Sequence, residues 1–100
     1  KAFNGALGAC HALEIPFAFG TLGVNGTDVF LGTPDLPHEL GDIMHHAWAA
    51  FIATGRPETQ RLSNWPTYSP TSRTVMRFAD TTELMHDPWP SARKSWEGVR

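Results

Sequence analysis

The residue best placed to do chemistry is His11, which lies in a run of small and apolar residues from Leu7 to Glu14. Gly8 lets the backbone turn tightly there, so the histidine can be partly shielded and close to a neighbouring segment. Histidine is the side chain that exchanges a proton near neutral pH, which suits a general base. On spacing alone, a loop histidine with only local hydrogen bonds is the simpler interpretation.

Two other constellations have the residue types for chemistry but weaker spacing. Cys10 adjoins His11, yet neighbouring residues of an extended loop point in opposite directions, so a cysteine–histidine nucleophile pair is disfavoured. His38, Asp42 and His45 follow a spacing of i, i+4 and i+7 and could present metal ligands on one face of a helix. A solvated polar face that happens to be rich in histidine is the better explanation. We therefore predict no metal and no cofactor.

Composition narrows the class of protein. The chain has 100 residues, of which 41% are hydrophobic and 18% charged, and these values fit a single globular domain. The net charge of −2 offers no basic surface for nucleic acid, and no apolar run approaches the ~18–20 residues that span a bilayer. We expect neither nucleic acid nor a membrane as a partner. The first residue is Lys1 and no leader is recognisable, so we expect a piece of a longer protein and leave its compartment open.

The strongest periodic pattern predicts a helix over residues 37–54. Its apolar residues recur at offsets of 0, 3, 4, 7, 8 and 11 and would line one helical face: Leu40, Ile43, Met44, Ala47, Trp48 and Phe51. Pro37 suits the first turn, and Gly55 followed by Pro57 is a common stop signal.

The remaining elements are shorter. Alternating polar and apolar residues predict a β-hairpin, and modest helical character follows the two prolines after it. The expected order is a histidine-bearing loop over 1–20 with a short helical turn after His11, a loop over 21–36, the helix over 37–54, a loop over 55–72, the hairpin over 73–87 and a terminal helix over 90–99.

The segment from Gly8 to Gly20, GACHALEIPFAFG, resembles the catalytic-histidine signature of type B carboxylesterases, the family of para-nitrobenzyl esterases and cholinesterases. In that family the signature is followed by a variable loop and by an amphipathic helix similar to residues 43–55. A Trp-Pro step like Trp65-Pro66, a hairpin similar to residues 74–87 and an Asp-Pro step like Asp87-Pro88 come next. The order and spacing match along nearly the whole chain.

The resemblance implies the C-terminal portion of an α/β-hydrolase, mainly helical with a short antiparallel β-hairpin and not a complete α/β domain. Such enzymes order their triad as serine, acid and histidine, so His11 would be the catalytic histidine. None of the serines lies in a Gly-x-Ser-x-Gly frame, and we expect the fragment alone to be inactive. The resemblance gives Glu14 a supporting role in the turn. Ala12, Leu13 and Phe17 are candidates for the wall of the substrate pocket, with a place in the structural core as the alternative.

Two hypotheses about function follow. The chain is part of a serine carboxylesterase, with a small-molecule ester as substrate and the remaining N-terminal part of the esterase as partner, or it is a free-standing, non-catalytic interaction domain. An amphipathic helix facing a missing sheet also predicts self-association. In the esterase hypothesis, the histidines outside the signature are expected to be dispensable for the chemistry: His38, His45, His46 and His86.

Overall fold

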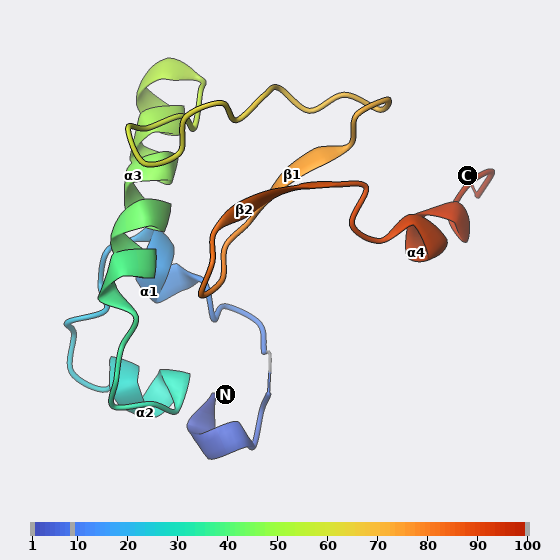
Figure 1. Cartoon of the computed structure of the whole chain (residues 1–100). Coiled ribbons are helices and arrows are strands. Elements are labelled where there is room, and N and C mark those ends of the chain that lie inside the picture. The colour runs from blue at the N-terminus through green and yellow to red at the C-terminus, as the bar shows by residue number, and fades with distance from the viewer. Residues whose placement is uncertain (1, 9, 100) are drawn as a thin grey trace. The chain divides into compact units, whose positions relative to one another are not determined.

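The computed structural model describes residues 2–8 and 10–99, which fall into two compact units, Lys1–Asn64 and Trp65–Arg100. Ala9, a member of the histidine signature, lies outside the described residues. The first unit contains the 3-10 turn η1 (Phe3–Gly5) and the helices α1 (Ile15–Ala18), α2 (Thr27–Leu31) and α3 (His38–Thr54). The second contains the strands β1 (Thr74–Arg77) and β2 (Glu83–His86) and the helix α4 (Pro90–Lys94) (Figure 1).

Helix α3 is the longest element, and it begins one residue after the expected start and ends at the expected residue. Gly55 ends it with a left-handed conformation, φ 76°, and its N–H donates to the carbonyl of Phe51 at 2.8 Å. Within the predicted apolar stripe, Met44 and Ala47 are buried, whereas Phe51 is exposed. The stripe is therefore only partly covered within this chain.

Helix α1 packs against α3 in the first unit. The contact continues past α1 to Leu22, which is only 4% exposed and lies against Gly41 of α3. The buried apolar residues of this unit form its small core: Ala2, Leu22, Leu31, Met44, Ala47 and Leu62.

The expected loop over 21–36 contains the short helix α2, which the sequence analysis missed. Gly26 and Gly32 flank it with positive φ values of 89° and 69°, conformations that glycine adopts without steric cost. Thr27 is buried, and its hydroxyl donates to the carbonyl of Thr21 at 3.3 Å. Five residues are too few to show a helical period, so composition alone favoured an irregular segment.

In the second unit, β1 and β2 form the expected antiparallel hairpin, with Arg77 opposite Glu83 in register. The Arg77 guanidinium donates to the Glu83 carboxylate at 2.6 Å. The terminal helix is shorter than expected, because α4 ends at Lys94 and the chain continues as turns. Helix α4 is joined to the end of the hairpin by Arg93, which donates to both carboxylate oxygens of Asp87 at 2.9 Å.

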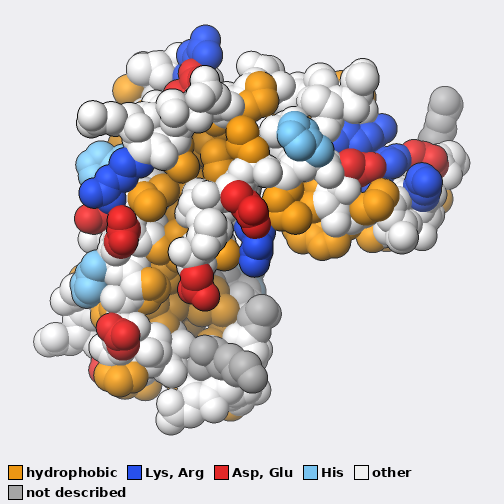
Figure 2. Space-filling view, in the orientation of Figure 1, with side chains coloured by type: hydrophobic (Ala, Val, Ile, Leu, Met, Phe, Trp, Pro, Cys, Tyr) orange, Lys and Arg blue, Asp and Glu red, His pale blue; other side chains and the backbone are white. Residues whose placement is uncertain are grey.

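Much apolar surface remains accessible in each unit, and Figure 2 shows hydrophobic side chains over wide areas of one face. On α3 the exposed fraction is 41% for Trp48, 55% for Phe51 and 81% for Ile52. In the second unit, Trp89 and Trp96 are exposed as well. Among the described residues, no helix combines the length and the apolar character needed to cross a bilayer.

Candidate active site

His11 lies at the start of a tight turn that leads into α1, and its side chain is exposed. The next residue, Ala12, has φ 70°, a left-handed conformation that costs an alanine energy. The N–H of Ile15 donates to the carbonyl of Ala12 at 3.2 Å and closes the turn. The imidazole is thus presented to solvent from a short, strained turn.

Glu14 is the last residue before α1 and contributes through its backbone. Its carbonyl accepts hydrogen bonds from the N–H groups of Phe17, at 3.1 Å, and Ala18, at 2.9 Å. Its side chain is exposed and forms no cap of the helix N-terminus. The backbone carbonyl of Glu14 therefore helps to form the single turn of α1 that follows the His11 segment.

The candidate pocket residues Ala12, Leu13 and Phe17 are all half-buried, and the buried Pro16 lies among them in the sequence. Neither of the two cavities described below includes any of the three. Partial burial fits both alternatives raised by the sequence: an incomplete pocket wall, or core that another segment covers.

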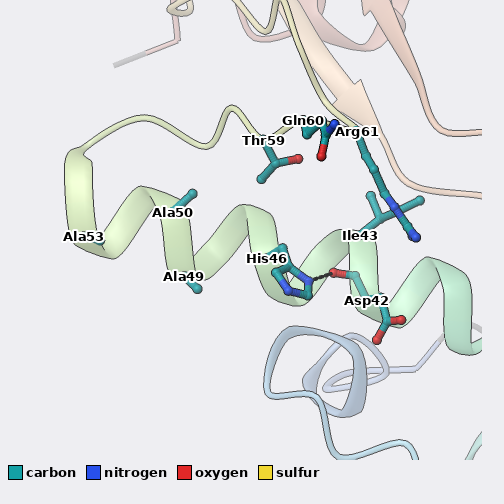
Figure 3. Close-up of a pocket in the computed structure, with 9 residues that line it drawn as sticks. All are labelled: Asp42, Ile43, His46, Ala49, Ala50, Ala53, Thr59, Gln60 and Arg61. Carbon is teal, nitrogen blue, oxygen red and sulfur yellow. Dashed lines mark hydrogen bonds between the residues drawn. The ribbon is translucent and has the colours of Figure 1, made fainter.

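A groove of about 600 Å³ lies in the first unit between α3 and the segment 59–61 (Figure 3). On its α3 side, the Nδ1 atom of His46 is 2.7 Å from the backbone carbonyl oxygen of Asp42, one turn earlier in the same helix. The groove residues are Asp42, Ile43, His46, Ala49, Ala50, Ala53, Thr59, Gln60 and Arg61. A smaller cavity of about 300 Å³ lies between η1 and α2.

The histidines of α3 differ in their partners. His46 bonds within its own helix, whereas the Nδ1 atom of His45 is 3.0 Å from the carbonyl oxygen of Ala18, at the end of α1. The spacing of His38, Asp42 and His45 does not make a metal cluster: within residues 2–8 and 10–99, no group of three His, Cys, Asp or Glu side chains could hold an ion. The sequence analysis missed the contact of His45 with α1, since its partner lies 27 residues away.

The carboxylesterase family model matches residues 3–96 of the chain. Phenmedipham hydrolase of Pseudarthrobacter oxydans is 36% identical over an alignment of 84 residues, and the match covers 77% of this chain and 16% of that protein. Para-nitrobenzyl esterase of Bacillus subtilis (strain 168) is 31% identical over 86 residues, covering 86% of this chain and 17% of that protein.

Solved structures agree with the sequence comparisons. A structure of PNB esterase superposes with a TM-score of 0.73 at 30% identity and covers 84% of this chain and 17% of that chain. The Geobacillus stearothermophilus carboxylesterase matches with a TM-score of 0.73 at 32% identity, covering 88% of this chain and 19% of that one. The chain thus spans less than a fifth of the length of these proteins, and it belongs to the carboxylesterase family as a part of an α/β-hydrolase fold.

Proposed function

We propose that this chain is the C-terminal part of a serine carboxylesterase and supplies its catalytic histidine, His11. The observation that carries the proposal is the position of His11: an exposed imidazole on a strained turn, held by the backbone bond from Ile15 to Ala12, inside a segment that the family model covers. Strained turns are common at active sites, where the surrounding structure maintains a conformation that presents a side chain.

In the complete enzyme, His11 acts as the general base. It accepts the proton of a serine hydroxyl while the serine oxygen attacks the ester carbonyl, and it then returns that proton to the leaving alcohol. A water molecule next gives a proton to His11 as its oxygen attacks the acyl-enzyme, and the serine recovers a proton from His11 as the acid leaves. The serine, the triad acid and the oxyanion donors come from the remaining N-terminal part of the enzyme.

The residues around His11 have supporting parts in this proposal. Glu14 stabilises the turn through its carbonyl, which binds two N–H groups of the α1 segment. Ala12, Leu13 and Phe17 are half-buried and form part of the apolar wall for a small-molecule ester. The relatives bear the names of a hydrolase and an esterase, which supports ester-bond cleavage as the reaction class.

The remaining part of the esterase is also the partner that the exposed apolar surface requires. Phe51 and Ile52 of α3 are more than half exposed, and Phe19 just after α1 is 71% exposed. Burying such side chains yields roughly 1.5–3 kcal/mol each, so contact with the rest of the fold would stabilise the whole enzyme.

The test is a pair of alanine variants of the full-length esterase. His11→Ala should lower kcat by about 10³–10⁴-fold or more while circular dichroism stays unchanged, because the triad acts as a unit. His38→Ala is the matched control, since His38 is an exposed histidine at the start of α3, and its activity should stay within several-fold of wild type. A His11→Ala enzyme that keeps more than about a tenth of the activity would remove His11 from catalysis.

A further inference from the structure

We propose that His45 is a positioning residue that fixes α1 on α3 and thereby sets the place of His11. The inference rests on the proposed catalytic function of His11. It starts from one contact across the sequence: the Nδ1 atom of His45 and the carbonyl oxygen of Ala18 are 3.0 Å apart, although the residues are separated by 27 positions. His45 thus connects the long helix of the unit to the one-turn helix that follows the histidine loop.

The chemistry of this contact assigns the proton. A carbonyl oxygen only accepts hydrogen bonds, so Nδ1 of His45 must donate and the ring carries its proton there. Ala18 is the last residue of α1, where helix carbonyls lack partners within the helix. The four residues of α1 are too few to form a stable helix alone, so its position depends on contacts of this kind.

A second observation places the same segment against the same face of α3. Gly20 has φ 65°, and a Cβ atom built on it would lie 3.3 Å from His45 Nδ1. Two residues later, Leu22 lies against Gly41, one helical turn before His45. Gly41 and His45 share a helix face because they are four residues apart. The chain from α1 to Leu22 is therefore in contact with α3 at two successive turns.

The position of His11 depends on that of α1 because only a short backbone segment separates them. Three residues separate His11 from the start of α1, and the hydrogen bond from Ile15 to Ala12 closes them into a turn. Because the backbone of this turn has little conformational freedom, a shift of α1 also moves His11. A displacement of about 1 Å at a catalytic group can lower a rate by roughly 10²-fold. His45 acts through the backbone of this segment, so it is a positioning residue and takes no part in proton transfer.

The test uses three substitutions at position 45 of the full-length esterase. His45→Asn places an amide N–H close to the position of Nδ1, so it can still donate to Ala18, whereas His45→Gln extends its amide one bond further and His45→Ala has no donor. We expect kcat per active site to fall about tenfold to a hundredfold in the Ala and Gln variants, with KM changed less than threefold. This departs from the expectation drawn from the sequence, in which His45 is dispensable, because the sequence did not reveal its contact with Ala18. The Asn variant should recover most of kcat.

Active-site titration with an irreversible serine-directed inhibitor separates positioning from a purely structural role. A purely structural role would reduce the number of titrated sites and leave kcat per site unchanged. His38→Ala is the control, because His38 is an exposed histidine at the start of the same helix, seven residues before His45. The Gln variant keeps a polar side chain of similar length, so it can test the positioning role if the Ala variant does not fold.

Two results would overturn the inference: an unchanged kcat per titrated site in the Gln variant, or an Asn variant as impaired as the Gln variant. The His11→Ala variant distinguishes these from failure of the proposed function. If His11→Ala is inactive while the position 45 variants are normal, only the positioning role is wrong. If His11→Ala is active, the catalytic assignment itself is wrong, whatever the variants at position 45 do.

Discussion

Gly41 of α3 lies so close to Leu22 that a Cβ atom at position 41 would fall 2.4 Å from the Cδ1 atom of Leu22. This approach brings the segment after α1 onto the helix, and Leu22 is 4% exposed at the contact. A glycine inside a helix ordinarily costs about 1 kcal/mol relative to alanine. Here the close packing of Leu22 provides a reason for the glycine.

We predict that Gly41→Ala destabilises the protein although alanine is the better helix former. The methyl group would force the buried Leu22 side chain to move, and overpacking of this kind costs about 1–3 kcal/mol, against a gain in helix propensity of about 1 kcal/mol. Urea unfolding would measure the loss. In a double-mutant cycle, Gly41→Ala should cost less in the Leu22→Ala background, where the clash is removed. Equal costs in the two backgrounds would contradict this explanation.

The isolated 100-residue chain should hydrolyse no ester above the rate in buffer. A histidine base without a serine nucleophile and oxyanion donors has no acyl intermediate to form. An assay of the purified chain with an activated para-nitrophenyl ester measures this directly. Turnover that survives His11→Ala would indicate a contaminating esterase, whereas turnover abolished by the substitution would show that the chain is catalytic alone.

The isolated chain should also self-associate through the exposed side of α3. Phe51 and Ile52 are exposed there, and contiguous apolar surface on a protein favours association. Sedimentation velocity should detect dimers or larger species that dissociate in a Phe51→Asp, Ile52→Lys double variant. As a control, one acidic and one basic substitution at the exposed, polar residues Asn25 and Gln60 should leave the self-association unchanged. A monodisperse wild-type monomer would rule out this prediction.

The Asp87–Arg93 pair should make the stability of the second unit depend on pH. The Arg93 guanidinium, hydrogen-bonded to Asp87, lowers the pKa of that carboxyl below its ordinary value of 3.8. A carboxyl whose pKa is depressed in the folded state contributes stability above its unfolded pKa, and the contribution is lost as pH falls through the folded value.

Asp87→Asn tests this dependence. The variant should be less stable than wild type near neutral pH. The difference should shrink as pH falls below about 3.8, where the carboxyl of the unfolded chain binds a proton, and should be lost once pH passes below the lowered pKa of the folded state. Unfolding followed by tryptophan emission across this range provides the measurement. Glu83→Gln, at the exposed Arg77 pair, is the matched control. A difference between Asp87→Asn and wild type that is independent of pH would exclude the carboxylate as its origin.

Local patterns in the sequence predicted the elements that local interactions determine. The apolar period and the Gly55 stop located α3 to within one residue, because helix register and C-capping depend on neighbours within about four positions. Alternation predicted the hairpin for the same reason. The five residues of α2 are too few to show a helical period of apolar residues. Thr27 and Leu31 are buried in this helix, and their burial depends on contacts made by the folded unit.

For the candidate site, too, some features could be read from the sequence and others only from the tertiary structure. Residues of the His11 signature are contiguous, so the sequence by itself pointed to His11 as the candidate and carried the family resemblance that the comparisons then supported. The proposed role of His45 comes from tertiary structure alone. Its spacing placed it among polar histidines of a helix face, and only folding brings its ring to Ala18, 27 residues away. A contact between distant segments is set by how they pack, which no local period or propensity encodes.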